Sequence, residues 1–150
     1  MRVASTAIYR HVRQPKYILM PMCPDKHQHW TTAWAKLVHL TEEDVRTQGI
    51  DIVLRDLEEF STRDSDVGAE VNGSGPEAKR ARRLLRECWE VGITLRPGPR
   101  LELQAIMDVG KDRGIGAPED SFVLSLPCSQ ETFFQSLSDA FDRCCVMKDR

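Results

Sequence analysis

The sequence lacks any run that approaches the roughly 18 consecutive apolar residues needed for a membrane-spanning helix. The early positive charge of Arg2 is not followed by the long apolar segment that a secretory signal peptide carries. These two absences argue against a membrane protein and against export. We therefore expect the protein to be made and kept in the cytoplasm.

A charge excess of one sign is also missing, because 21 Lys and Arg residues stand against 23 Asp and Glu residues and give a formal charge of −2. Such a chain has no overall field that would attract nucleic acid or an anionic membrane. Neither is an expected partner, although a local basic patch would escape this argument.

No disulfide framework is indicated, because the five cysteines are an odd number at irregular spacing. Only Cys144 and Cys145 are close together, and adjacent cysteines pair into a strained ring only rarely. Reduced thiols in a reducing compartment are therefore expected.

What is present is the composition of one ordinary domain. With 150 residues and 41% hydrophobic content, the chain is long enough to bury a core without disulfides or metals, which predicts a single domain over residues 1–150. Residues 61–75 hold hardly any large apolar side chain. A flexible loop is predicted there.

Short apolar or alternating runs bounded by Pro, Gly and polar clusters predict strands. These runs are residues 16–22, 30–40, 89–95, 101–106 and 121–127. Helices are predicted over residues 42–60, where Thr41 is the N-cap, over residues 76–87, and after the N-cap Ser129. Residues 97–99 predict the turn of a hairpin, and residues 110–118 a loop.

The two ends of the chain show the same order of strand, polar loop, strand and capped helix. Adding 84 to Tyr17, Leu19, Val53 and Leu57 gives the apolar residues Leu101, Leu103, Leu137 and Phe141. The echo predicts an α+β fold of two β-β-α halves, with a mainly antiparallel sheet and helices packed on one side of it. Apolar matches also arise by chance, so unrelated ends remain an open alternative.

No constellation of residues predicts catalysis or a bound metal. His27 and His29, with Asp25 nearby, are the first place to look for a metal, but no matching ligand cluster accompanies them. Cys23 with His11 or His39 has no orienting carboxylate and no oxyanion-hole motif. We therefore expect a non-enzymatic protein without a metal or other cofactor.

Charge is concentrated in two predicted helices and one loop. Residues 79–86 form a basic run that favours a solvated helix face, or contacts to RNA phosphates. The glycine-rich loop at residues 110–116 lacks the ending of a phosphate-binding P-loop and predicts a connector. Residues 42–59 are rich in carboxylates, which can steer a basic partner.

The pattern as a whole resembles small immunity proteins of bacterial contact-dependent growth inhibition systems. The resemblance rests on residues 17–21, Trp30 with Thr31 and Thr32, Trp89 with Val91, and residues scattered toward the end of the chain. The latter are Gly114, Ile115, Gly116, Leu126, Pro127, Leu137, Ala140 and Phe141. The resemblance implies a cytosolic, non-enzymatic protein that covers the active site of a cognate toxin domain, often a nuclease.

No residue role carries over from the resemblance, so candidate partner-binding residues follow from charge and aromatic character. They are Glu42, Glu43, Asp44, Asp64, Asp66, Glu70, His27, His29 and Trp30. Two other interpretations stay open. The first is a small RNA- or phosphate-binding enzyme that uses residues 79–86 and 111–116, and the second is an oligomerisation module that pairs through a strand edge.

Overall fold

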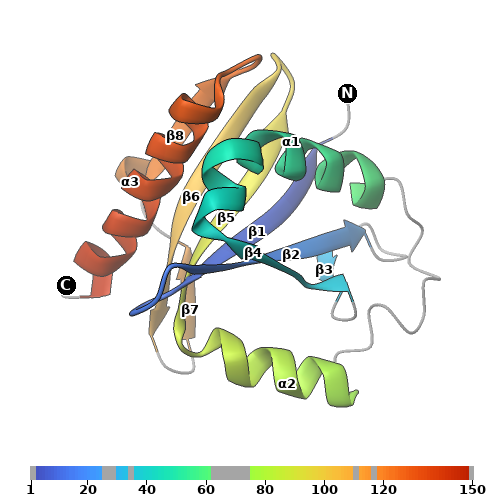
Figure 1. Cartoon of the computed structure of the whole chain (residues 1–150), viewed down its shortest axis with the longest axis vertical. Helices are drawn as coiled ribbons and strands as arrows, with labels where there is room; N and C mark the ends of the chain where they lie inside the picture. The colour runs from blue at the N-terminus through green and yellow to red at the C-terminus, as the bar shows by residue number, and fades with distance from the viewer. Residues whose placement is uncertain are drawn as a thin grey trace.

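The computed structural model describes residues 3–24, 30–33, 36–61, 75–109, 112–115 and 118–148 (Figure 1). Its strands are β1 (Ala4–His11), β2 (Lys16–Pro24), β3 (Trp30–Thr32), β4 (Val38–Thr41), β5 (Cys88–Arg96), β6 (Arg100–Val109), β7 (Asp112–Ile115) and β8 (Ser121–Ser125). Its helices are α1 (Glu42–Ser61), α2 (Pro76–Leu85) and α3 (Gln130–Lys148), with a short 3-10 turn, η2 (Pro118–Asp120).

The described strands form an antiparallel sheet, and the fold is α+β as predicted. The main path of the sheet runs β3-β2-β1-β5-β6-β7. Strand β2 pairs along its first part with β4 and along its last part with β3. Strand β6 pairs in the same way with β8 and β7. Each long strand therefore carries two short ones on its outer edge.

The register of the strands confirms the two halves that the echo predicted. Lys16 pairs with Thr41 and Arg100 pairs with Ser125, so both partners are displaced by 84 positions. The eight apolar residues of the echo are all buried. Among the described residues each half, however, contains four strands and a helix rather than two strands and a helix. The strands β1 and β5, which precede the predicted halves, and the short strands β3 and β7 also join the sheet.

The two halves meet where β1 and β5 pair in the middle of the sheet. Ile8 pairs with Leu19, and Ile93 pairs with Leu103, which is the equivalent of Leu19. Ile8 and Ile93 are therefore equivalent, and the strands β1 and β5 correspond with an offset of 85. Ala7 pairs with Gly92, and the offset of 85 makes Gly92 the residue of the second half that is equivalent to Ala7. An approximate twofold axis therefore passes through this pair.

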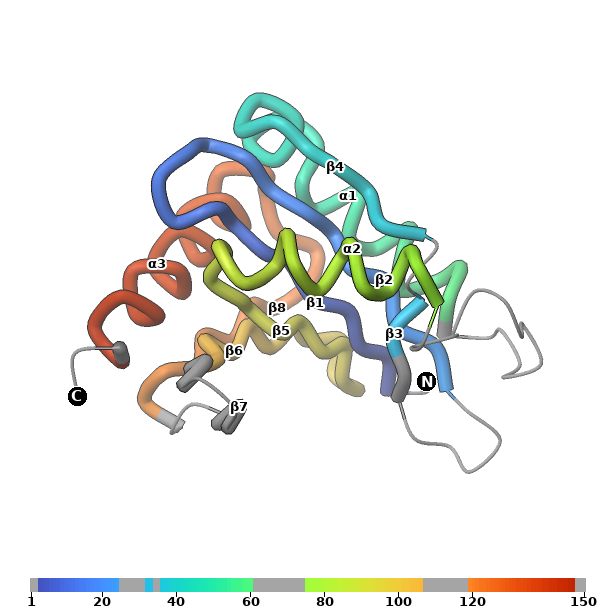
Figure 2. The backbone as a smooth tube through the Cα atoms, turned by 90° about the horizontal axis from the view of Figure 1, so that it is seen from below, coloured from blue at the N-terminus to red at the C-terminus, as the bar shows by residue number. Residues whose placement is uncertain are grey.

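Helices α1 and α3 lie together on one face of the sheet and bury the main core (Figures 1 and 2). Both helices begin at the hydroxyl caps expected from the sequence, Thr41 and Ser129, whose side chains accept a backbone N–H three residues later. In the core, the rings of Tyr17 and Phe141 meet edge to face, with centroids 6.0 Å apart. None of the described helices combines the length and apolar character needed to cross a membrane.

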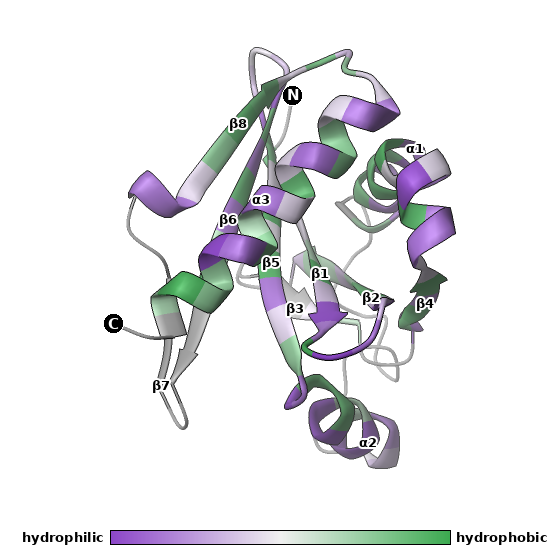
Figure 3. Ribbon diagram, turned by 60° about the vertical axis from the view of Figure 1, so that its left-hand side comes forward, coloured by the Kyte–Doolittle hydropathy of each residue, from purple (hydrophilic) through white to green (hydrophobic). Residues whose placement is uncertain are grey.

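Helix α2 packs on the opposite face, so the prediction of helices on one side is wrong for this helix. Successive side chains of a strand point to opposite faces. Ile8 and Leu19 face the main core, whereas their neighbours face a second cluster, which consists of Ala7, Tyr9, Ile18, Met20, Leu85 and Cys88. Figure 3 shows the apolar side of α2 turned toward the strands and its polar side turned away.

Three other expectations about elements were wrong. No strand was predicted at β1, although it is one of the two central strands. The single strand expected over residues 30–40 is instead two separate strands, β3 and β4, and Lys36 N donates to Ala33 O at 3.0 Å between them. Strand β7 lies inside the loop predicted at residues 110–118. Most of the flexible loop predicted at residues 61–75 lies outside the described residues.

Candidate functional site

The N-terminus of α1 carries three of the predicted partner-binding residues. Asp44 N donates to Thr41 Oγ1 at 3.1 Å, and Thr41 N donates to the Asp44 carboxylate at 2.9 Å. This reciprocal capping box satisfies two N–H groups and lowers the pKa of Asp44 through the hydrogen bonds from Thr41. Asp44 therefore takes part in capping the helix. Glu42 and Glu43 are exposed and are not part of this capping box.

An acidic stripe, defined as Glu43, Asp51 and Glu58, runs along the exposed side of α1. Its members are seven or eight residues apart, which places them on one side of a helix with 3.6 residues per turn. Gln130 of α3 donates to Asp51 at 2.9 Å. Arg46 lies over the ring of Phe134, 4.4 Å from its centroid. The basic group of Arg46 is thus drawn toward α3, and the stripe keeps a negative charge.

The remaining predicted partner-binding residues are described only in part. His27, His29, Asp64, Asp66 and Glu70 lie outside the described residues, and so do Asp25 and Gln28. Trp30 begins β3, where its backbone pairs with Pro24 at one edge of the sheet. Their role in binding stays a prediction.

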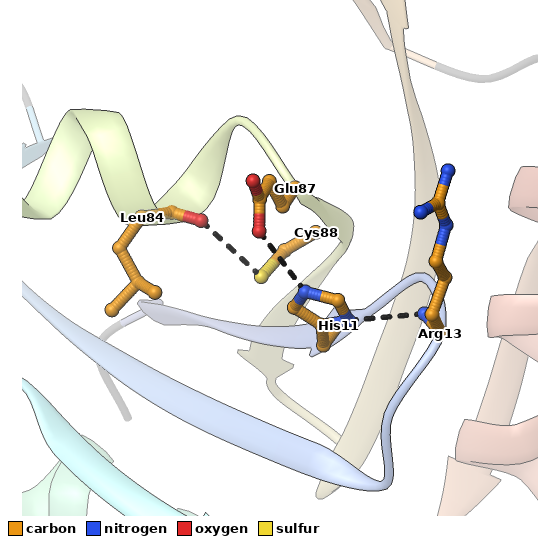
Figure 4. A network of polar contacts seen from close by, with 5 residues as sticks. All are labelled: His11, Arg13, Leu84, Glu87 and Cys88. Atoms are coloured by element: carbon orange, nitrogen blue, oxygen red, sulfur yellow. Dashed lines mark hydrogen bonds and ion pairs between the residues drawn. The ribbon is translucent and has the colours of Figure 1, made fainter.

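His11, Glu87 and Cys88 lie together where β1 meets the end of α2 (Figure 4). Nε2 of His11 lies 3.1 Å from the Glu87 carboxylate, and its Nδ1 accepts the backbone N–H of Arg13 at 3.0 Å. The thiol of Cys88 donates to Leu84 O at 3.7 Å, and burial raises its pKa to about 11. Because both ring nitrogens of His11 are engaged, this group does not provide an activated thiol.

Cys23 is not near either histidine with which the sequence could have paired it. His39 pairs with Ile18, and Cys23 lies five residues farther along β2, which corresponds to roughly 16 Å. His11 follows Arg10, which pairs with Tyr17, and therefore lies at the other end of β2. The five cysteines, all of which lie among the described residues, form no disulfide bond. Among the residues that the structure describes, no group of three or more His, Cys, Asp or Glu side chains could hold a metal ion.

The basic run forms the outer side of α2. Lys79, Arg80, Arg82 and Arg83 are exposed, while Ala78, Ala81 and Leu85 are buried against the second face of the sheet. This matches the amphipathic helix expected from the sequence. Of the glycine-rich loop at residues 110–116, residues 112–115 form β7 rather than a connector, and the others lie outside the described residues.

A pocket that the sequence did not reveal lies between α1 and the edge formed by β2 and β4. Asp56 lines it with an exposed fraction of only 6%, and its Oδ2 has no hydrogen-bond partner among the described residues. The sequence interpretation counted Asp56 with the surface carboxylates of the helix. Its spacing of three residues from Val53 and four from Phe60, both buried, was the signal that it faces inward.

The second half contains a buried ion pair. Arg143 donates to the carboxylate of Asp120 through Nη2 at 2.6 Å and Nε at 3.0 Å, and Asp120 has no exposed surface. The offset of 84 relates Asp120 to Lys36 and Arg143 to Glu59. The two positions therefore hold one acid and one base in each half, with the signs exchanged.

Comparison with known proteins finds the same fold in another protein but assigns no activity. No protein family model and no curated protein matches the chain. A solved structure from Neisseria meningitidis, a protein of unknown function, is similar to it with a TM-score of 0.68 and 19% sequence identity. The similarity covers 95% of this chain and 96% of the other chain, so the two share a fold over almost their whole length.

Proposed function

We propose that this protein is a cytoplasmic immunity protein, which binds a cognate toxin domain and acts by covering its active site rather than by catalysis. The proposal rests on the sequence resemblance to immunity proteins of contact-dependent growth inhibition systems. The structural observation that carries it is the exposed acidic stripe of α1, Glu43, Asp51 and Glu58, headed by Glu42.

The stripe suits a nuclease as the target of inhibition. A nuclease attracts phosphates, so its active cleft is generally basic, and carboxylates on a rigid helix can imitate the charge of its substrate. Helix α1 is held by the main core and capped by Thr41 and Asp44. Its exposed carboxylates are therefore presented on a fixed support, which reduces the entropy lost on binding.

The first experiment co-expresses this protein with the C-terminal domain encoded immediately upstream of its gene. We expect that domain to stop growth when it is produced alone, and we expect this protein to copurify with it and restore growth. A neighbour that is harmless, or that fails to bind, would contradict the immunity function.

The second experiment locates the contact. A triple variant with Glu43→Lys, Asp51→Lys and Glu58→Lys should slow association and weaken protection, because the long-range attraction is reversed. The matched control changes three exposed charges on the other face of the sheet, Lys79→Glu, Arg80→Glu and Arg83→Glu. Equal association rates for the two variants would remove α1 as the contact.

The basic side of α2 supports a second candidate function, which is binding of RNA phosphates. Lys79, Arg80, Arg82 and Arg83 are exposed on this helix, and so is Arg86, which follows its last residue. Binding of this kind weakens steeply with salt. A labelled single-stranded RNA that binds at 50 mM salt, loses affinity at 200 mM and is not bound by the α2 control variant would favour it.

A further inference from the structure

The pocket beside α1 has a volume of about 260 Å³ and opens between this helix and strands β2 and β4. It is lined by Leu19, Val38, Leu40, Ile52, Arg55, Asp56, Glu59 and Phe60. Five of these residues are apolar, and the charged ones all come from α1. The pocket thus combines apolar walls with two carboxylates and one guanidinium group.

Asp56 is the buried polar group of this pocket. The Thr6 hydroxyl on β1 partly offsets the rise in the pKa of Asp56, but it donates its proton to Met20 O at 3.1 Å. Oδ2 of Asp56 has no hydrogen-bond partner among the described residues. A buried carboxylate oxygen without a partner is costly, since it has left water and received nothing in exchange. A buried carboxyl group that lines a pocket and has one unpartnered oxygen is a candidate binding site for a donor.

The second half of the chain shows that the fold does not require this carboxylate. The offset of 84 places Ala140 at the position of Asp56, and Ala140 is fully buried on α3. The same offset places Phe122 at the position of Val38, and Phe122 packs against the main core. The second half thus has Ala140 on the helix and Phe122 on the strand. At the equivalent positions the first half has Asp56 and the smaller Val38, and the pocket lies beside them.

We propose that this pocket binds an alkylammonium group, with the ammonium on Asp56 and the hydrocarbon stem against the apolar walls. A single unpartnered oxygen suits an ammonium, which is a compact point charge, better than the planar fork of a guanidinium, which needs two acceptors. Val38, Leu40 and Ile52 offer surface for a chain of methylene groups.

The other charged groups at the pocket favour a cation over an anion. Glu59 adds a second carboxylate, and Arg55 is exposed, so water weakens its repulsion of a bound cation. The two carboxylates leave the pocket with a net negative charge. The same chemistry is offered by a free aliphatic amine and by the side chain of a lysine in a protein.

The test is a titration of the whole protein, followed by NMR of its methyl groups at pH 8, with n-butylammonium as the probe. At this pH Asp56 is ionised, since burial raises its pKa only to about 6. We expect saturable shifts at Val38, Leu40 and Ile52, and much weaker shifts with n-butanol, which has the stem without the charge. Methyl groups of the second half, such as those of Leu124, should not respond.

The variant Asp56→Asn should lower the affinity for n-butylammonium at least tenfold. Glu58→Gln is the matched control, because it removes the same charge from the exposed side of the same helix and should leave the affinity within twofold. Asp56→Ala provides a second variant that copies Ala140. Shifts that do not saturate, or that persist unchanged in both Asp56 variants, would overturn the proposal.

Two arms of the titration distinguish the sources of the group. The capped amino acid Nα-acetyl-lysine-N-methylamide carries the same ammonium with a peptide backbone attached. If it binds at least as tightly as n-butylammonium, the pocket accepts a lysine of a protein. If only the free amine binds, the ligand is a small aliphatic amine. Failure of both probes to bind would refute the alkylammonium site itself and leave the immunity function untouched.

Discussion

The ring of Phe133 on α3 lies against the bare backbone of Gly49 on α1. A methyl group added at Gly49 would come within 3.0 Å of Cε1 of Phe133, which is fully buried. The offset of 84 makes these two residues equivalent positions of the two halves. The helices therefore meet near the approximate twofold axis with a glycine from one half and a ring from the other.

The contact between Gly49 and Phe133 predicts a large coupling between the two positions. Gly49→Leu should destabilise the protein by about 2–3 kcal/mol, because the added side chain overpacks the core. Phe133→Ala should cost about 3–5 kcal/mol, because it leaves a cavity. In the double variant the leucine occupies part of that cavity, so the loss measured by urea unfolding should be smaller than the sum. Strict additivity would show that the two residues do not share this space.

Asp56 predicts an unusual dependence of stability on pH. Burial raises its pKa in the folded protein from 3.8 to about 6, so between these values the folded state binds more protons than the unfolded state. Stability must therefore fall as the pH rises through this window, by up to about 3 kcal/mol, and the loss is complete above pH 6.

Urea unfolding at pH 4 and pH 8 tests this dependence. Asp56→Asn should lose less stability over this interval than the unchanged protein and should be the more stable of the two at pH 8. Asp51→Asn, on the exposed side of the same helix, serves as the control. Parallel curves for the unchanged protein and Asp56→Asn would rule out the raised pKa.

The buried ion pair between Asp120 and Arg143 predicts that its signs can be exchanged. Asp120→Lys alone should destabilise the protein by about 3–5 kcal/mol, because it buries a second positive charge next to Arg143. Adding Arg143→Glu should recover most of this loss, since the equivalent positions in the first half are Lys36 and Glu59. A double variant as unstable as Asp120→Lys would show that the two halves do not tolerate the same exchange.

The thiols predict a fixed order of alkylation. At pH 8 iodoacetamide should label exposed Cys145 first, while Cys88 and Cys144 should react only after unfolding, because both are buried and burial raises the pKa of each to about 11. Mass spectrometry of digested samples gives the order. Rapid labelling of Cys88 in the folded protein would instead mean that His11 activates it.

The elements that the sequence predicted well are those whose pattern is local. The stripes of α1 and α3 and their caps at Thr41 and Ser129 repeat at helical spacing, which needs no knowledge of partners. The alternation of β5 and β6 around the turn at residues 97–99 is equally local. The echo at an offset of 84 was visible for the same reason, because equivalent buried positions select apolar residues in both halves.

The candidate sites were predicted only where exposure follows from helical spacing. Glu42 and Glu43 lie on the surface as expected, and Asp44 acts as a cap. Asp56 was missed, because a carboxylate in an acidic helix is normally at the surface, and its burial depends on how α1 packs against the sheet, including β1, a strand that was not predicted. The pocket is formed by three separate elements, α1, β2 and β4, so no local sequence pattern predicts it.

The sequence by itself determined the α+β class, the two capped helices and the repeated order of parts, because hydrophobic spacing and capping act within a few residues. Only the tertiary structure decided that β1 lies in the centre, that α2 covers the second face, and that Ala7 pairs with Gly92 at the axis. These features depend on pairing between segments distant in the chain, and the pattern of a single strand does not specify its partner.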